Sequence, residues 1–374
     1  MIVPFVDLRA QYLSIRRELD ATIQAVIDQN AFIGGRYVKA FEEAFAEKCG
    51  VAHCIGVGNG TDALYITLRM LGISSGDEVI TVANTWISTA ESISQTGACP
   101  VFIDIDADSY NMDVTKIEGK ITDRTRAILP VHLFGQPAQI EAVQGFCGRY
   151  GLHLIEDCAQ AHFARYQGEK VGTFGIAGTF SFYPGKNLGG YGDGGAVITN
   201  DDGLAERVRM FANHGALKKH EHRMEGINSR LDGLQAAILS AKLRYIDDWN
   251  QERHRKGLLY NRLLEEIDEV ATPTLTEGVD HIFHIYCVRC PQRDALRNYL
   301  KEKGIATSIH YPKALPFLKV YSYLGHEPQD FPLASDYQNQ LLSLPIYPEL
   351  RESQIEHVVD QIRVFYAQED SPET

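Results

Sequence analysis

Short apolar segments alternate with segments of helical spacing along the first half of this chain, and this alternation limits its fold more than any other feature. Residues 78–82, for example, are mostly apolar and precede a segment of helical spacing at 86–95. Such alternation predicts a parallel sheet flanked by helices, with strands buried on both faces. Ligands of such a sheet bind beyond the carboxyl ends of its strands. The expected strands are 54–57, 78–82, 101–104, 127–131 and 152–155, and the expected helices are 8–26, 63–71, 86–95 and 140–150.

The pattern changes near residue 245. The segments expected after that point are a charged helix at 244–267, a strand at 281–290, a helix at 294–303 and a strand at 305–309. With 374 residues, of which 44% are hydrophobic, the chain is long enough to bury two cores. We therefore predict an α/β protein with a large domain over residues 1–245 and a smaller C-terminal domain over residues 246–374.

Composition and charge exclude several classes of protein. A formal net charge of −13 argues against a nucleic-acid binder, because phosphate backbones need basic surface. No apolar run approaches the ~20 residues that span a bilayer, and the first residues do not resemble a secretion signal. Seven scattered cysteines indicate reduced thiols in a cytoplasm. The lone Cys287-x-x-Cys290 pair lacks the second ligand pair that a zinc site needs, so we expect it to pack in a strand.

Lys186 is the most informative single residue. A short apolar strand at 179–182 leads into a glycine-rich turn that contains this lysine. A lysine that faces a cavity loses solvation, its pKa falls, and it becomes a nucleophile toward aldehydes. Schiff-base chemistry with pyridoxal 5′-phosphate (PLP) requires such an amine. The alternative is a solvated loop lysine.

Other residues supply what a PLP site would need besides the lysine. The turn at 58–63 lies between a strand and a helix, where free N–H groups bind phosphate. Asp157, at the end of a strand, could keep the pyridine nitrogen protonated. Gln160 could donate to the phenolic oxygen of the ring, Trp86 could stack on the ring, and Ser181 could add a hydroxyl at the phosphate. Jointly these features favour a PLP enzyme.

Two alternatives of other classes stay open at this point. Gly58, Gly60 and Ala63 fit a dinucleotide fingerprint, with Asp77 or Glu78 as the ribose acid, and would suit an NAD-dependent oxidoreductase. That alternative leaves Lys186 unexplained. The second alternative is a non-catalytic relative that binds PLP or a sugar nucleotide.

Taken together, the motifs resemble the DegT-like sugar-nucleotide aminotransferases of PLP fold type I. The resemblance covers nearly the whole chain and includes 4–8 (PFVDL), 60–64 (GTDAL), 156–161 (EDCAQA), 181–189 (SFYPGKNLG) and 228–232 (NSRLD). It implies a large domain with a mostly parallel seven-stranded sheet between helices and a smaller C-terminal α/β domain.

The resemblance also assigns roles to residues. It implies that Lys186 is the catalytic residue that forms the Schiff base with PLP and that Asp157 contacts the pyridine nitrogen. Asn228 is expected to reach the phosphate in the neighbouring subunit, so a homodimer with shared active sites is implied. The expected cofactor-binding residues are Gly60, Thr61, Asp62, Trp86, Asp157, Gln160, Ser181 and Asn228.

The implied reaction transfers an amino group from L-glutamate to a keto carbon of a nucleotide-linked hexose. Segments 218–228 and 310–317 look most like the corresponding segments of enzymes that aminate C-3 of a dTDP-linked 3-keto-6-deoxyhexose. The alternatives are amination at C-4 and amination of a UDP-linked keto sugar. Basic side chains within 218–223 would form a local positive site on an acidic protein. A metal is not expected at the His220-x-His222 pair, because a third ligand is missing. The expected substrate-binding residues are Tyr183, Lys219, Arg230 and His310. The product is expected to enter a surface polysaccharide, such as the O-antigen of lipopolysaccharide, or a glycosylated metabolite.

Overall fold

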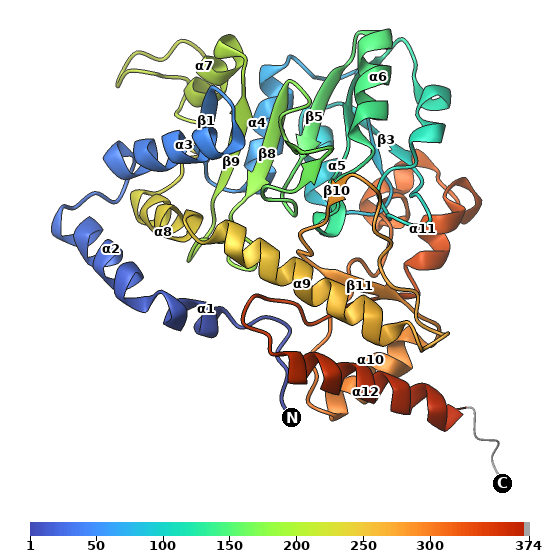
Figure 1. The fold of residues 1–374 in the computed structure, drawn as a ribbon. Helices are drawn as coiled ribbons and strands as arrows, with labels where there is room; N and C mark the ends of the chain where they lie inside the picture. Colours follow the sequence, from blue (N-terminus) through green and yellow to red (C-terminus); the bar gives the residue numbers. More distant parts are fainter. Residues whose placement is uncertain (370–374) are drawn as a thin grey trace.

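The computed structural model describes residues 1–369, and its centre is a seven-stranded sheet (Figure 1). The strand order is β1-β9-β8-β5-β4-β2-β3. Strand β9 runs antiparallel to both of its neighbours, and the other pairs are parallel. The predicted α/β fold with a mostly parallel sheet is therefore confirmed. The strands are β1 (His53–Val57), β2 (Glu78–Val82), β3 (Cys99–Ile103), β4 (Thr125–Leu129), β5 (His153–Asp157), β8 (Ala177–Ser181) and β9 (Gly195–Thr199).

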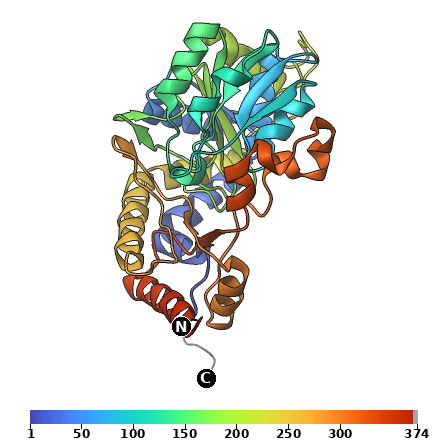
Figure 2. The same cartoon turned by 90° about the vertical axis from the view of Figure 1, so that its right-hand side faces the viewer.

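Helices cover both faces of this sheet (Figures 1 and 2), as buried strands require. Every residue of β2 and of β9 is buried. On one face, α4 packs against β8 and β9, and on the other face α3 packs against β1 and α8. The helices are α1 (Leu8–Ser14), α2 (Arg16–Asp28), α3 (Gly35–Cys49), α4 (Gly60–Met70), α5 (Ser88–Gln95), α6 (Ile140–Tyr150), α7 (Asp202–Phe211), α8 (Gly233–Leu243), α9 (Ile246–Leu264), α10 (Arg293–Glu302), α11 (Pro332–Tyr337) and α12 (Glu352–Glu369).

The N-terminal helix differs from the prediction. A single helix over 8–26 was expected, but the chain leaves helical geometry at Ile15, whose φ and ψ are −126° and 22°. The break lets Ile15 pack with Leu19 in a buried cluster against α3 and α8. Tertiary burial therefore decides this position, where the sequence has no helix breaker.

A smaller antiparallel sheet lies beside α9, near both termini (Figures 1 and 2). It consists of β11 (Tyr286–Arg289) and β12 (Leu341–Leu344), with α10 and α12 packed nearby. The predicted boundary at residue 245 falls just before α9 and stays a prediction. The remaining short elements are β6 (Arg165–Tyr166), β7 (Glu169–Lys170), β10 (Val279–Asp280) and the 3₁₀ turns Val114–Lys116, Glu118–Lys120, Leu133–Gly135, Leu315–Phe317, Lys319–Leu324 and Pro328–Asp330.

In this part of the chain, one predicted strand is shorter than expected and another was wrong. Of the strand expected over 281–290, residues 281–285 are irregular, because Ile282 and Ile285 donate backbone hydrogen bonds to the loop at 134–135 instead of to a strand. The segment 305–309 forms only isolated bridges, at Ile305 and Ser308. No helix within residues 1–369 is both long and apolar enough to cross a membrane.

Candidate active site

A cavity of about 750 Å³ lies at the carboxyl ends of β5 and β8, between the two sheets. Residues of the large sheet, of helix α9 and of the segments around β11 and β12 all contribute to its wall. The carboxyl ends of parallel strands were the predicted place for a ligand. The predicted site residues that line this cavity are Gly60, Thr61, Trp86, Asp157, Gln160, Ser181, Tyr183, Lys186 and His310.

The turn that carries Lys186 is held in place by its own backbone hydrogen bonds and by a buried lysine outside the cavity. Its own backbone N–H donates to the carbonyl of Tyr183 at 2.9 Å. Gly189 is required because a Cβ there would lie 2.4 Å from the carbonyl oxygen of Pro184. Behind the turn, the buried Lys242 donates from Nζ to the Gly189 carbonyl at 2.8 Å. Burial lowers the pKa of Lys186 to about 8, partly opposed by the charge of Asp157. About a tenth of this amine is therefore unprotonated at pH 7, far more than for an ordinary lysine.

Asp157 ends strand β5 with its carboxylate oriented by two donors. The Thr89 hydroxyl donates to one oxygen at 2.8 Å, and the Ala159 N–H donates to the other at 3.1 Å. Burial raises the pKa of Asp157, and these two hydrogen bonds and the Lys186 charge oppose the rise. The cavity thus contains an oriented carboxylate that can accept a hydrogen bond from a further donor.

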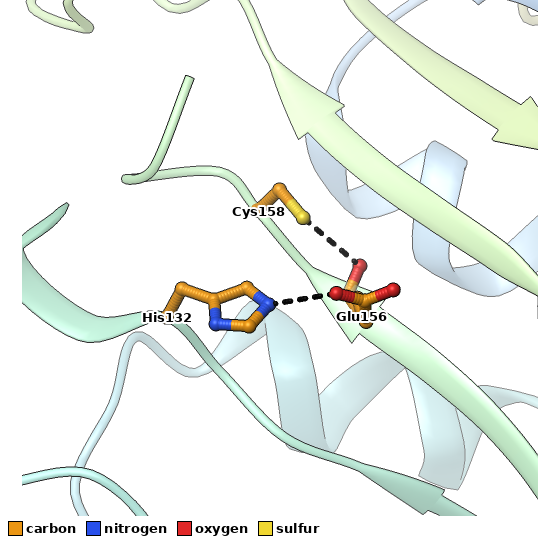
Figure 3. A group of neighbouring side chains, drawn as sticks. All are labelled: His132, Glu156 and Cys158. Carbon is orange, nitrogen blue, oxygen red and sulfur yellow. Dashed lines mark hydrogen bonds and ion pairs between the residues drawn. The ribbon is translucent and has the colours of Figure 1, made fainter. Parts of the chain in front are cut away.

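Glu156, which precedes Asp157 in β5, is held in a buried cluster with His132 and Cys158 (Figure 3). The Glu156 carboxylate accepts from the N–H groups of residues 172, 174 and 175, at 2.7–2.9 Å, and from His132 Nε2 at 3.1 Å. The Ala138 N–H donates to His132 Nδ1, so Nε2 carries the proton. The three side chains are close enough to bind a metal, but their ligand atoms are already engaged and burial raises the pKa of the Cys158 thiol well above its usual range. The cluster is therefore a hydrogen-bonded anchor for the end of β5.

The N-terminus of α4 also lines the cavity. Asn59 caps the helix by accepting from the Asp62 N–H at 2.8 Å. The hydroxyls of Thr61 and Ser88 lie 2.7 Å apart, and both residues line the cavity together with Ser181. Helix amides and hydroxyls thus converge as an anion site. Ser88 was missed in the sequence, because the helix was expected to begin at residue 86 and begins at Ser88.

Gln160 and Trp86 meet at a tyrosine that sequence reasoning did not single out. The Gln160 side chain accepts from the Phe134 N–H at 2.7 Å and donates to the Tyr311 hydroxyl at 2.8 Å. The rings of Tyr311 and Trp86 lie 5.7 Å apart. Trp86 precedes α5 instead of opening it and is 58% exposed, so its indole forms the rim of the cavity.

Four predicted site residues do not line this cavity. Asp62 directs its carboxylate to the Ser229 hydroxyl, at 2.6 Å. Arg230 lines a second cavity of about 660 Å³, beside α3. Lys219 and Asn228 line neither cavity.

The basic loop at 218–223 is less positive than its sequence indicates. Lys218 pairs with Glu221, and Arg223 lies 3.7 Å from Glu206. His222 donates from Nδ1 to the His214 carbonyl at 2.7 Å, which leaves only one of its ring nitrogens for any other ligand. Within residues 1–369, Lys219 has no ion-pair partner.

The dinucleotide interpretation is wrong. Glu78 is the first residue of β2 and Asp77 precedes it, so both lie at the end of the sheet opposite to the cavity. Each pairs with an arginine, Asp77 with Arg126 at 3.2 Å and Glu78 with Arg124. Neither carboxylate can reach a ligand bound at the N-terminus of α4.

A family model matches residues 13–363, described as the DegT/DnrJ/EryC1/StrS aminotransferase family. The chain belongs to this family. It is a PLP-dependent transaminase of a sugar-nucleotide aminotransferase family. The expected family and the expected cofactor, PLP, are therefore confirmed. The NAD-dependent oxidoreductase and the non-catalytic relative are set aside.

Several relatives match over almost their full length. A pleiotropic regulatory protein of Geobacillus stearothermophilus is 46% identical, over 98% of this chain and 99% of its own. The dTDP-3-amino-3,4,6-trideoxy-alpha-D-glucose transaminase of Streptomyces venezuelae is 43% identical, over 96% of this chain and 95% of its own. The UDP-N-acetyl-3-dehydro-alpha-D-glucosamine 3-aminotransferase of Acidithiobacillus ferrooxidans is 42% identical, over 96% and 97%. Among solved structures, S. venezuelae DesV in complex with a ketimine intermediate superposes with a TM-score of 0.95, at 42% identity over 97% of this chain and 98% of that one.

The cavity fits PLP. A Cβ on Gly60 would lie 2.6 Å from the Ser181 Cβ, so glycine alone lets the two phosphate-side segments approach this closely. An amine of lowered pKa, a buried carboxylate and an aromatic rim face the same space. These are the groups that the cofactor's aldehyde, ring nitrogen and ring face require.

Gly60→Ala is expected to destabilise the protein by about 1–3 kcal/mol, since overpacking forces backbone shifts of this cost. It should also weaken PLP binding, because the α4 amides would move away from Ser181. Gly145→Ala is the matched control: Gly145 is exposed within α6 and a Cβ there meets nothing within 4 Å, so we expect a gain of about 0.5–1 kcal/mol. Chemical unfolding and cofactor titration of both variants measure these effects. Equal stability in the two variants would contradict the tight contact.

Covalent attachment of PLP to the apo-protein is expected to accelerate with pH up to about 8 and then level off. Only the unprotonated amine attacks an aldehyde, and burial lowers the pKa of Lys186 to about 8. Stopped-flow absorbance at fixed cofactor concentration measures the rate. A rate that kept rising toward pH ~10.4, the ordinary lysine value, would show that this amine is solvated.

Proposed function

We propose that this enzyme transfers the amino group of L-glutamate to C-3 of a dTDP-linked 3-keto-6-deoxyhexose. The observation that carries the reaction is the placement of the Lys186 amine in one cavity with the buried Asp157 carboxylate. Position 3 is favoured because the relatives named for dTDP-linked and UDP-linked sugars both act there. The dTDP carrier is favoured by the resemblance of segments 218–228 and 310–317.

The residues of this chain would divide the work as follows. PLP, when bound, supplies an aldehyde that takes up the amino group and a ring that delocalises electrons. Lys186 would hold the cofactor, and its Nζ would move the proton during the reaction. Asp157 would keep the ring nitrogen protonated, with its orientation set by Thr89 and Ala159. The α4 amides, with the hydroxyls of Thr61 and Ser181, bind the phosphate.

The other predicted ligands suit a shared site. Tyr183 and His310 line the cavity of their own chain and would contact the sugar nucleotide. Lys219, Asn228 and Arg230 do not line it, so we propose that each serves the cavity of a second protomer in a homodimer. Exposed apolar side chains flank the second cavity, at Ile33 and Leu217, and a protomer interface there would cover them. Sedimentation analysis tests the dimer.

We place the enzyme in the cytoplasm, where sugar nucleotides are made, with its product used for a surface polysaccharide such as O-antigen or for a glycosylated metabolite. The absence of any candidate membrane span in residues 1–369 is compatible with this placement.

A substrate panel tests the proposed function. Purified holoenzyme is incubated with L-glutamate and with 3-keto or 4-keto sugars carried on dTDP and on UDP. We expect glutamate-dependent bleaching of the yellow cofactor band and an aminated dTDP-sugar, detected by mass spectrometry with the position read by NMR. Product only from a 4-keto sugar, or only from a UDP carrier, would replace the proposed substrate by that one. A panel without product and without a glutamate-dependent spectral change would reject the donor as well.

A further inference from the structure

His284 lies in the wall of the active-site cavity, and the mechanism above gives it no part. It belongs to the irregular segment that was expected to be a strand. The neighbouring N–H groups of Ile282 and Ile285 donate to carbonyls at 134–135, so the backbone on both sides of His284 is fixed. A side chain carried by such a segment has a defined direction.

A chain of amide hydrogen bonds fixes the tautomer of this histidine. The Asn250 amide donates to the His162 carbonyl at 2.9 Å, and the Asn187 amide donates to the Asn250 oxygen at 2.8 Å and to the Ile282 carbonyl at 3.4 Å. Backbone carbonyls only accept, so neither amide can be reversed. The Asn187 oxygen therefore faces His284 Nδ1, at 3.0 Å, and Nδ1 must carry the hydrogen.

The opposite ring nitrogen is then a free acceptor. Within residues 1–369, Nε2 of His284 has no hydrogen-bond partner, and it is not among the buried polar atoms sealed from solvent. Since the residue lines the cavity and Nδ1 faces Asn187, Nε2 is the atom available to a ligand there. Burial, together with the charges of Lys186 and Arg253, holds the pKa of His284 well below its usual range. The ring is therefore neutral at neutral pH, and the lone pair of Nε2 carries no proton.

A neutral acceptor selects for a ligand group that keeps a hydrogen. Carboxylates, phosphates and keto oxygens are acceptors themselves and gain nothing from Nε2. The amino group of the donor gives up its N–H hydrogens when its nitrogen is transferred, whereas sugar hydroxyls keep theirs in both half-reactions. We infer that His284 Nε2 accepts a hydrogen bond from a hydroxyl of the sugar substrate and so helps to set sugar specificity. This inference rests on the proposed function.

The two roles of the imidazole can be separated by two substitutions. His284→Asn retains an N–H at the position of Nδ1, which can still donate to Asn187, and lacks any atom at Nε2. His284→Gln places an amide oxygen near the position of Nε2 and loses the bond to Asn187. His254→Asn is the matched control, because His254 also donates from Nδ1 to a backbone carbonyl, that of His281 at 2.8 Å, but does not line the cavity.

Binding is measured by calorimetry on the holoenzyme with a dTDP-6-deoxyhexose that carries a hydroxyl in place of the keto group. We expect His284→Asn to weaken binding about tenfold, the value of one hydrogen bond, and His284→Gln and His254→Asn to bind within about twofold. The KM for the keto sugar should likewise rise in His284→Asn and stay nearly unchanged in His284→Gln and His254→Asn. The KM for L-glutamate and the visible spectrum of the bound cofactor should not change.

The reversed order, with His284→Gln weakened and His284→Asn unaffected, would assign His284 a structural role through Asn187 and overturn the inference. Weakening confined to L-glutamate would move the contact to the amino donor and overturn it as well. If His284→Asn failed to fold, His284→Gln alone would decide, with retained sugar affinity in support and lost affinity against. Failure of the proposed function is a separate result, because the unsubstituted enzyme would then bind or convert no keto sugar.

Discussion

Lys186→Ala is expected to abolish amino transfer, with kcat/KM lowered by about 10⁴-fold or more. Among residues 1–369, Lys186 is the one lysine that lines the cavity, and burial lowers its pKa to about 8. The same atom would hold the cofactor and move the proton, so no neighbouring group can replace it. The visible band of covalently bound PLP should disappear, although the cofactor can still bind through the phosphate site at the N-terminus of α4.

Lys242 provides a matched control, because burial also lowers its pKa to about 8. Its Nζ donates to the Gly189 carbonyl and lies over the Tyr191 ring, outside the cavity. Lys242→Met should keep the visible band and lose part of the support of the Lys186 turn, seen as a lower Tm. Absorbance spectra of both variants after reconstitution decide the matter. A band that survives in Lys186→Ala and vanishes in Lys242→Met would reverse the assignment.

The sequence was sufficient for those parts of the site that depend on strand ends. Asp157 ends β5, and Lys186 follows β8 by five residues. Parallel strands present their carboxyl ends at one edge, so these two residues could be brought together without knowing the strand order. Gly60 and Ser181 could be placed by the same argument.

Residues contributed by distant irregular segments could not be found in this way. His284 lies in a segment predicted to be a strand, and Tyr311 follows another, but Ile282 and Ile285 bond to the loop at 134–135 and Tyr311 packs against the core of the large sheet. Thr89, which orients Asp157, is separated from it by 68 positions and carries no local signal. The antiparallel insertion of β9 between β1 and β8 likewise follows from tertiary pairing and not from strand composition.

Asp157→Asn is expected to lower the rate of amino transfer by about 10³-fold while leaving the apo-protein as stable as before or more stable. An amide has the shape of the carboxylate and can keep the Ala159 and Thr89 contacts, but it has no charge to hold a proton on the ring nitrogen. Burial raises the pKa of Asp157 in the folded state, so the ionised form costs stability at any pH above that raised value. This cost decreases as the pH falls below the folded pKa and is gone below the ordinary pKa of the unfolded chain, and the substitution should remove it at pH 7.

Asp104 is the matched control, because it is an equally buried carboxylate that works as a structural cap. Its oxygens accept from the N–H groups of Leu333 and Ala334 at 3.0 and 2.9 Å, and it does not line the active-site cavity. Asp104→Asn should therefore lower the Tm and spare the chemistry, which is the opposite of the result expected for Asp157→Asn. Calorimetric Tm values of the apo-proteins at pH 7, set beside single-turnover rates with L-glutamate, measure both effects. A loss of stability in Asp157→Asn with an unchanged rate would show that this carboxylate supports the fold and takes no part in the reaction.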